Sequence, residues 1–214
     1  MDDRSRSFIP AAGHDWLLPL YDPLQRLLGG DAARRELVAQ AEIRPGQRVL
    51  DIGCGTGSGA VLIKQLHPQA EVVGLDPDPK ALARARRKAE QAGVAVRFDQ
   101  GFADQLPYPA ASFDRVVSSF MLHHLDPVEK RRTLAEARRV LVPGGSLHVL
   151  DFGGEGRRQD GLLARLLHPA GHLDANYEGR IPALMDEAGF AQPGELGQRG
   201  TLFGRIAWYQ ASAP

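Results

Sequence analysis

The sequence predicts an α/β fold: a doubly wound, mostly parallel sheet with helices on both of its faces. From residue 48 onward, short apolar runs alternate with longer segments that have helical periodicity. Helix-capping residues stand between these segments, as at Asp78-Pro79 and Asp126-Pro127-Val128-Glu129. Strands that alternate with helices of this length form right-handed βαβ units, and such units build a parallel sheet.

The strands and helices can be assigned in order from residue 48. We expect strands at 48–52, 72–76, 94–98, 113–119 and 146–152. We expect helices at 58–66, 79–92 and 127–141, the second of them closed by Gly93. The sequence Pro143-Gly144-Gly145 is interpreted as a turn that leads into the strand at 146–152.

The two ends of the chain depart from this alternation. Residues 8–41 have the pattern of amphipathic helices, and residues 153–190 begin with a Gly/Arg-rich stretch ahead of further predicted helices. A last strand is expected at 201–211, with a stretch near 195–198 as its candidate hairpin partner. We therefore divide the single domain into an N-terminal helical cover (1–44), a ligand-binding core (45–152), a helical substrate-side insertion (153–190) and C-terminal strands that complete the sheet (191–214).

The composition of the chain excludes several classes of protein. The 214 residues are 43% hydrophobic and 24% charged, which is typical of a globular domain. The 26 basic residues balance 26 acidic ones, so no basic surface for nucleic acid is predicted. The single cysteine, Cys54, allows neither an internal disulfide nor a cysteine-based zinc site. Because the sequence shows no signal peptide and no apolar run of membrane-spanning length, we expect a cytoplasmic protein.

The most informative stretch is residues 49–59, Val-Leu-Asp-Ile-Gly-Cys-Gly-Thr-Gly-Ser-Gly. Its four alternating glycines let the backbone adopt positive φ and approach a ligand closely. The helix that follows adds unpaired N–H groups at its start. Ligands of open α/β sheets bind beyond the carboxyl ends of the strands. The residues expected to converge there are Asp51, Asp76, Ser119 and Asp151.

Two cofactors compete for this loop. A dinucleotide fingerprint can be placed from Gly55 to Ala60, with Asp76 as the acid that binds the ribose. Its register is poor, because the first glycine should follow the strand directly and that residue is Gly53. The carboxylate of Asp51 would also face a pyrophosphate with two negative charges. S-adenosylmethionine carries an ammonium, a sulfonium and a ribose diol instead, so both carboxylates favour it.

Further motifs follow the glycine loop along the chain. They are Val49–Gly57 with Gly74-Leu75-Asp76, Gln105–Tyr108, Ser112–Val117, Leu122–Leu125 and Arg139–Gly145. Together these motifs resemble the class I S-adenosylmethionine-dependent methyltransferases, in the small-molecule branch near the ubiquinone/menaquinone-biosynthesis C-methyltransferases. The resemblance spans residues 45–152. It implies a seven-stranded sheet whose last strand is antiparallel. It also implies methyl transfer to a small molecule, with S-adenosylhomocysteine as the product.

The resemblance also assigns roles to individual residues. The residues that would line the methionine and ribose part of the cofactor are Asp51, Gly53, Cys54, Gly55, Thr56 and Gly57. Asp76 would bind the ribose hydroxyls, Pro77 would lie against the adenine, and Ser119 would border the sulfonium. Relatives often carry an acid after the glycine that follows the third strand. Here Phe102 and Ala103 follow Gly101, so the adenine contact becomes apolar or uses the Ala103 backbone.

Candidate catalytic groups are fewer. His123 and His124 are the candidate general bases, because histidine titrates near neutral pH, although either one could serve only in packing or capping. Tyr21 is a candidate contact for the cofactor carboxylate. His168 and His172 are four residues apart but lack a third ligand, so we predict no metal site.

The acceptor is predicted to be a small, partly apolar molecule, because the bulky residues Phe120, Met121 and Leu122 follow the fourth strand. Two functions of other classes remain open. An NAD-dependent oxidoreductase would bind NADH and ignore S-adenosylhomocysteine. A non-catalytic S-adenosylmethionine-binding protein would bind the cofactor and transfer no methyl group.

Overall fold

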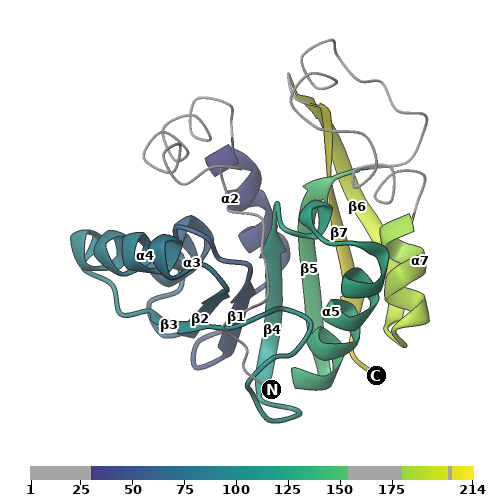
Figure 1. Ribbon diagram of the computed structural model, residues 1–214, viewed down its shortest axis with the longest axis horizontal. Coiled ribbons are helices and arrows are strands. Elements are labelled where there is room, and N and C mark those ends of the chain that lie inside the picture. The colour runs from purple at the N-terminus through teal and green to yellow at the C-terminus, as the bar shows by residue number, and fades with distance from the viewer. Residues whose placement is uncertain (1–29, 154–179, 202–203) are drawn as a thin grey trace.

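The computed structural model describes residues 30–153, 180–201 and 204–214. These residues form a seven-stranded sheet with the strand order β3-β2-β1-β4-β5-β7-β6 (Figure 1). The strands are β1 (Arg48–Ile52), β2 (Glu71–Asp76), β3 (Arg97–Gln100), β4 (Phe113–Ser119), β5 (Leu141–Phe152), β6 (Ala191–Thr201) and β7 (Gly204–Ser212). The helices are α2 (Gly30–Gln40), α3 (Ser58–Leu66), α4 (Pro79–Ala92), α5 (Pro127–Val140) and α7 (Arg180–Glu187), with a 3₁₀ turn, η3 (Leu122–His124).

The directions of the strands confirm the predicted fold class. β1 pairs in parallel with β2 and with β4, and the parallel pairing continues outward to β3 and β5. β7 lies between β5 and β6 and is antiparallel to both of them. The sheet is therefore mostly parallel with an antiparallel last strand, as the resemblance implied.

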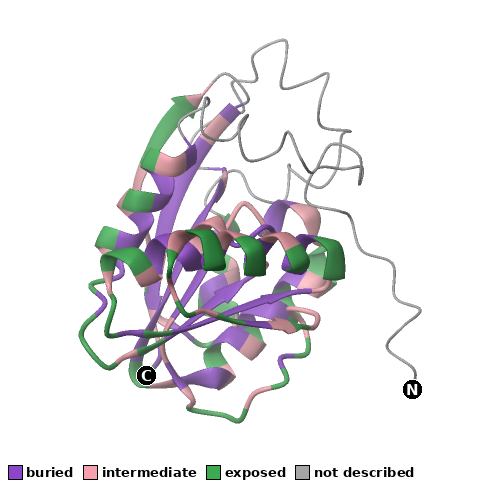
Figure 2. Cartoon of the chain, turned by 90° about the vertical axis from the view of Figure 1, so that its left-hand side faces the viewer, coloured by how far each residue is buried: buried purple, intermediate pink, exposed green. Residues whose placement is uncertain are grey.

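Helices cover both faces of the sheet (Figure 1). α2, α3 and α4 pack on one face, where Leu37 and Leu82 join a buried cluster that includes Val49 of β1. α5 and α7 pack on the other face, where Leu134 belongs to a second cluster with Leu50. Val49 and Leu50 face opposite clusters because side chains alternate along a strand. The inner strands are largely buried between the helix layers, whereas the edge strand β6 has no buried residue and the outward helix faces are exposed (Figure 2).

The predicted helix caps are confirmed. Asp78 Oδ1 accepts a hydrogen bond from the Lys80 amide at 2.8 Å at the start of α4, and Gly93 closes this helix in the left-handed conformation. At the start of α5, the Asp126 side chain accepts from the Val128 and Glu129 amides, and the Glu129 side chain accepts in return from the Asp126 amide. These caps fix where the two helices begin and thereby place the loops that precede them.

Three strand boundaries differ from the prediction. β3 is at Arg97–Gln100 and not at 94–98, because Val94 and Val96 pack against the core from the connection that follows α4. β6 extends over Ala191–Thr201 and its partner β7 begins at Gly204, so the hairpin is longer than expected. Pro193 is tolerated in β6 because this strand lies at the edge of the sheet.

The stretch Pro143-Gly144-Gly145 was predicted as a turn but lies inside β5. Gly144 has φ +76°, and its amide donates to the Ala213 carbonyl at 2.9 Å, so the strand stays paired with the chain end. The pairing between β4 and β5 shifts register between Phe113 and Arg115. The glycines therefore make an irregularity in a long strand.

Several predictions fall outside the described residues. Tyr21, His168 and His172 lie there, together with the helices predicted over 8–29 and 154–179. The division of the chain into four segments accordingly stays a prediction. Among the residues that are described, no helix has the length and apolar character needed to cross a membrane.

Candidate cofactor-binding site

A pocket of about 320 Å³ lies beyond the carboxyl ends of β1, β2, β3 and β4. Residues from the loops that follow these four strands, with residues of α2 and α5, form its walls. Ten residues predicted from the sequence line this pocket: Gly53, Cys54, Gly55, Thr56, Asp76, Pro77, Phe102, Ala103, Ser119 and His124. The rule that ligands bind at the carboxyl ends of the strands therefore located the pocket.

The glycine loop forms the floor of the pocket through backbone geometry. Gly53 has φ +69° and Gly55 has φ +52°, a region that residues with a Cβ rarely adopt. The Gly53 and Cys54 amides both donate to the Leu75 carbonyl, at 2.8 and 3.0 Å, which ties the loop to the end of β2. A Cβ at Gly53 would overlap the side chain of Met121. The loop thus requires glycine to approach both its ligand and the β4 loop.

Gly57 contributes to the packing of the helices beside the pocket. It precedes α3 with φ +79°, and a Cβ there would lie 2.7 Å from Cβ of Ala85 and 3.1 Å from the ring of Phe98. Gly57 does not line the pocket. It allows α3 to pack closely against α4, so its part in cofactor binding stays a prediction.

Asp76 is fixed at the pocket wall by two backbone amides. Oδ2 accepts from the Gly55 amide at 2.8 Å, and Oδ1 accepts from the Asp78 amide at 2.9 Å. Burial raises the pKa of Asp76 to about 6, against the lowering effect of these hydrogen bonds. Each carboxylate oxygen has a further lone pair, so the side chain can still accept hydrogen bonds from a diol.

Asp51 lies behind the glycine loop and not on the pocket wall. Its Oδ2 is buried and has no hydrogen-bond partner among the described residues. A Cβ at Gly59, which does line the pocket, would be 2.8 Å from this oxygen. Burial raises the pKa of Asp51 to about 7, while the nearby Arg34 lowers it. Only the backbone at Gly59 thus separates the carboxylate from the pocket. Its predicted contact with the cofactor stays a prediction.

Cys54 and Thr56 occupy the loop between the glycines. Burial raises the pKa of the Cys54 thiol well above its usual value, which fits a filler and not a nucleophile. Thr56 Oγ1 accepts a hydrogen bond from Lys88 Nζ at 3.1 Å, and the same ammonium donates to Ser58 Oγ at 2.7 Å. Lys88 of α4 therefore anchors the loop to the neighbouring helix.

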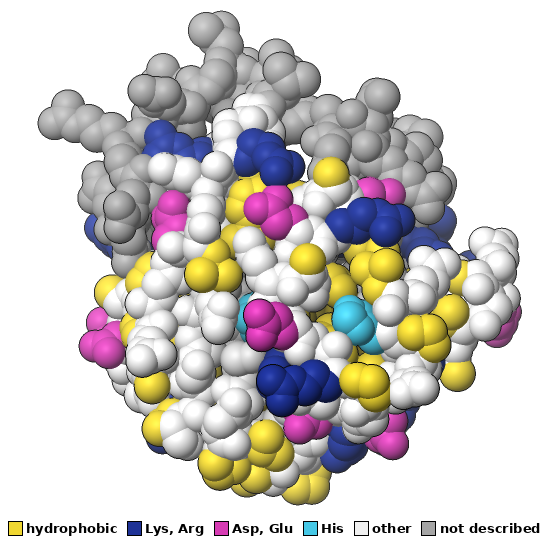
Figure 3. Space-filling view, turned by 180° about the vertical axis from the view of Figure 1, so that it is seen from behind, with side chains coloured by type: hydrophobic (Ala, Val, Ile, Leu, Met, Phe, Trp, Pro, Cys, Tyr) yellow, Lys and Arg dark blue, Asp and Glu magenta, His cyan; other side chains and the backbone are white. Residues whose placement is uncertain are grey.

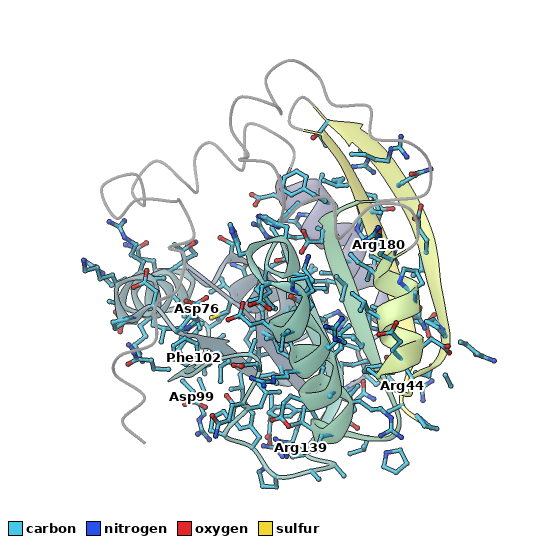
Figure 4. The ribbon with its side chains drawn as sticks, turned by 45° about the vertical axis from the view of Figure 1, so that its right-hand side comes forward. Arg44, Asp76, Asp99, Phe102, Arg139 and Arg180 are labelled. Atoms are coloured by element: carbon cyan, nitrogen blue, oxygen red, sulfur yellow. The ribbon has the colours of Figure 1, made fainter. Side chains whose placement is uncertain are left out.

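Phe102 and Ala103 form the pocket wall that follows β3, with Asp104 next to them. The Gly101 amide donates to the Asp76 carbonyl at 3.2 Å, which holds this wall beside the end of β2. Figure 4 shows Phe102 and Asp76 near each other to one side of α5. Glu129 and Thr133 of α5 also line the pocket.

The end of β4 carries strained backbone and aromatic rings. Ser119 and Phe120 line the pocket, and Phe120 has φ +57°, which is unfavourable for a residue with a bulky side chain. The Phe120 amide donates to the Leu150 carbonyl at 2.8 Å, and its ring centre lies 5.6 Å from that of Phe152. Two aromatic rings therefore flank this end of the pocket.

Arg34 of α2 is a pocket residue that the sequence analysis missed. Its side chain is 7% exposed, lines the pocket and has its guanidinium carbon 5.5 Å from the ring centre of Phe120. Asp31, 3.6 Å away, is its partner on the same helix. Its spacing in the sequence could have identified it, because Arg34 precedes Leu37 and Val38 by three and four residues and therefore shares their helix face. Both of these residues are buried.

The rings of the two histidines of η3 lie against each other, with 4.0 Å between their centres, but only one of them lines the pocket. His124 lines the pocket, whereas His123 is buried behind it. Nδ1 of His123 lies 2.7 Å from Oδ1 of Asp151, and its ring meets Phe152 edge-on with 5.0 Å between the ring centres. Although burial alone would raise it, the charge and hydrogen bond of His123 hold the pKa of Asp151 below its usual value. An ionised carboxylate can only accept hydrogen bonds, so Nδ1 of His123 is the donor in this pair.

Comparisons with known proteins agree with this site. A family model described as a methyltransferase domain matches residues 49–145. A demethylmenaquinone methyltransferase from Thermus thermophilus is 43% identical over 153 residues, which are 70% of this chain and 69% of that protein. A demethylmenaquinone methyltransferase from Deinococcus radiodurans is 42% identical over 64% of this chain and 57% of its own length. The match thus spans only part of each relative.

The fold also matches solved structures. The S-adenosyl-L-methionine complex of phosphoethanolamine N-methyltransferase 2 from Haemonchus contortus has a TM-score of 0.76. It covers 95% of this chain and 58% of the other, at 16% identity, so the likeness is one of fold. Fold, pocket and sequence together define an enzyme that takes a methyl group from S-adenosylmethionine. The chain belongs to the S-adenosylmethionine-dependent methyltransferase family.

Proposed function

We propose that the pocket holds S-adenosylmethionine in one orientation, with the methionine end on the glycine loop, the ribose on Asp76 and the adenine between Pro77 and the Phe102–Ala103 wall. The single observation that carries this proposal is the position of Asp76. Its carboxylate is fixed at the wall between the glycine loop and Phe102, which is where a ribose must lie if the other two parts are placed as stated. The pocket also fits a cation better than a pyrophosphate, because Asp51 lies behind its floor.

Arg34 is proposed as the partner of the cofactor carboxylate. It brings a buried guanidinium to the glycine-loop end of the pocket, and guanidinium groups bind carboxylates with two parallel hydrogen bonds. The role predicted for Tyr21 is the same contact, so both residues are candidates for it.

We propose a quinol, a reduced aromatic ring with hydroxyl groups, as the methyl acceptor. Both relatives described above are named for demethylmenaquinone, which is the oxidised form of such a quinol. The Phe120–Phe152 pair offers an aromatic surface beside the pocket, which suits a flat and partly apolar acceptor. On the face seen in Figure 3, acidic and basic side chains are interspersed among the described residues, and this supports a small molecule over a nucleic acid. A cytoplasmic location stays a prediction.

The proposed reaction needs alignment and one net proton transfer. When bound, S-adenosylmethionine supplies an electrophilic methyl group, and in-line attack by the acceptor carbon forms the C–CH₃ bond as the S–CH₃ bond breaks to give S-adenosylhomocysteine. The acceptor carbon then loses its hydrogen, so one proton leaves overall. We propose the histidine pair as the route for this proton, because His124 lines the pocket and Asp151 fixes the ring of His123 directly beside it.

Calorimetry with S-adenosylhomocysteine tests the cofactor site. We expect the wild-type protein to bind it and Asp76→Ala to bind it more weakly by about 1–3 kcal/mol, the range for hydrogen bonds to a charged group. Asp114→Ala is the matched control, because Asp114 also accepts from a backbone amide, that of Arg48, but lies outside the pocket. Equal affinity of the two variants, or no binding by the wild type, would contradict the proposed site.

The acceptor is tested by transfer of a labelled methyl group. The protein is incubated with methyl-labelled S-adenosylmethionine and reduced demethylmenaquinone, and we expect the label on the quinol ring. The oxidised quinone should accept far less label, because its ring carbon is a poor nucleophile. Binding of S-adenosylhomocysteine without transfer to the reduced quinone would refute the quinol while leaving the cofactor site intact. NADH binding without S-adenosylhomocysteine binding would favour the oxidoreductase.

A further inference from the structure

The connection between β3 and β4 is bound to α5 by side chains that lie outside the pocket. This connection carries Phe102, Ala103 and Asp104 on the pocket wall. The Leu106 amide, two residues later, donates to Glu136 Oε2 at 2.8 Å. The wall is therefore held close to its end by a residue of another element.

Arg139 completes this attachment through the two terminal nitrogens of its guanidinium group. Nη1 donates to the Tyr108 carbonyl at 2.8 Å, and Nη2 donates to the Leu106 carbonyl at 3.0 Å. The same guanidinium is paired with Glu136, with Nε 2.6 Å from Oε1 and Nη2 2.7 Å from Oε2. Arg139 and Glu136 together satisfy the amide of Leu106 and two carbonyls of one short loop. We call this pair the α5 clamp.

The helix that carries the clamp also lines the pocket. Asp126, Glu129 and Thr133 line the pocket from the first half of α5. Arg139 is six residues beyond Thr133, or about 9 Å along the helix at 1.5 Å per residue. Figure 4 shows Arg139 at the far end of α5 from Phe102. One rigid helix therefore supplies one wall and fixes the position of the other.

We infer that Arg139 and Glu136 are positioning residues that set the width of the cofactor pocket at the Phe102 wall. The inference rests on the proposed function for its ligand, since that wall is the one assigned to the adenine. Without the clamp, the Phe102–Asp104 segment keeps the Gly101–Asp76 hydrogen bond at its start and the buried Leu106 side chain beyond its end, but it loses the hydrogen bonds that fix the Leu106 backbone. Binding of the nucleoside would then have to order this segment, and ordering weakens affinity.

Arg138 provides a matched control on the same helix. Its Nε also donates to a backbone carbonyl, that of Gly189, at 2.8 Å. Gly189 follows α7 and lies away from the pocket. Arg138→Ala and Arg139→Ala therefore each remove an arginine that holds a backbone carbonyl, and only the second one releases the pocket wall.

The test measures binding of S-adenosylhomocysteine and of 5′-methylthioadenosine, which keeps the nucleoside but lacks the amino-acid end. We expect Arg139→Ala to weaken both ligands by the same factor of about ten, and Arg138→Ala to leave both dissociation constants within twofold of the wild type. In turnover, Arg139→Ala should raise KM for S-adenosylmethionine and leave kcat nearly unchanged. Arg139→Lys should restore little of the lost affinity, because a single ammonium group cannot replace the planar guanidinium with its several donors.

Melting temperatures of all variants separate positioning from loss of fold. If Arg139→Ala is too unstable to assay, Glu136→Gln takes its place, since it keeps an acceptor for the Leu106 amide and loses the ion pair. Equal affinities of the Arg138 and Arg139 variants for 5′-methylthioadenosine would overturn the inference. So would a loss confined to S-adenosylhomocysteine. Failure of the wild type to bind either ligand would instead refute the proposed function.

Discussion

Nδ1 of His123 lies 2.7 Å from Oδ1 of Asp151, and both side chains are buried. The two residues come from neighbouring strand ends, because His123 is in the turn after β4 and Asp151 is near the end of β5. The Phe152 amide donates to the same carboxylate oxygen at 2.7 Å. Asp151 is thus fixed by its own backbone and in turn fixes the imidazole.

Asp151→Asn tests whether this pair moves the proton. We expect kcat for methyl transfer to fall by about 10²-fold, the range for loss of a general base, because an amide does not stabilise an imidazolium. The dissociation constant for S-adenosylhomocysteine should stay within a factor of two, since Asp151 does not line the pocket. A kcat that is unchanged while the melting temperature falls would assign the pair to folding alone.

Asp51 should make the stability of the unliganded protein depend on pH. Its pKa is raised from 3.8 to about 7 by burial, so the unfolded chain releases this proton at lower pH than the folded one. The contribution of Asp51 to the free energy of unfolding is then fully present below about pH 4, and it declines as the pH rises to about 7. We expect Asp51→Asn to remove this decline and to stabilise the protein at pH 8 by about 1–3 kcal/mol, with little effect at pH 4.

Urea unfolding at pH 4, 6 and 8 gives the free energies of unfolding for this comparison. The same variant should bind S-adenosylhomocysteine more weakly at pH 8, because the wild-type carboxylate, ionised there, attracts the ligand's ammonium. A variant that is no more stable than the wild type at pH 8 would show that Asp51 is already well accommodated as an anion.

Features set by local sequence were predictable. Asp126 and Glu129 cap α5 as expected, because a capping box depends only on residues within one turn. Asp76 and Ser119 reach the pocket because parallel strands bring their carboxyl ends to one edge, which follows from the order of elements alone. Both inferences need only the sequence: the capping residues are enough for the first, and the alternation of strands and helices is enough for the second.

Features set by tertiary contact were not predictable. His123 and His124 are identical neighbours in sequence, and their rings lie 4.0 Å apart, but only the fold shows that His124 lines the pocket and that His123 pairs with Asp151. In the sequence, Arg34 has the pattern of a solvent-exposed residue on a surface helix. Only the fold shows that Phe120 lies beside it. The close approach of Gly59 places backbone between Asp51 and the pocket, which the sequence did not indicate, and the predicted contact of Asp51 with the ligand stays a prediction.

Arg34→Ala tests the proposed contact with the cofactor carboxylate. We expect S-adenosylhomocysteine to bind about 2 kcal/mol more weakly, or roughly thirtyfold, because a charge-assisted hydrogen bond is lost. 5′-methylthioadenosine has no carboxylate, so its affinity should not change. Arg35→Ala is the control, since Arg35 is the exposed neighbour on the same helix and does not line the pocket. Equal weakening of both ligands by Arg34→Ala would show a general effect on the pocket and no contact with the carboxylate.

Gly53→Ala tests whether the loop needs glycine for conformation or for close approach. Gly46 provides the comparison: it has φ +79°, similar to the +69° of Gly53, but a Cβ at Gly46 would meet nothing within 4 Å. Gly46→Ala should therefore cost only the left-handed conformation, about 1 kcal/mol of unfolding free energy. Gly53→Ala should cost about 1–3 kcal/mol more, because its Cβ displaces Met121, and it should also weaken S-adenosylhomocysteine binding. Adding Met121→Ala should recover part of this extra loss of stability, since the overlap with Cγ of Met121 is removed while the 2.8 Å approach to its Cβ remains. If the two glycine variants lose the same stability, the conformation of the loop, and not its approach to the β4 turn, is what requires glycine at position 53.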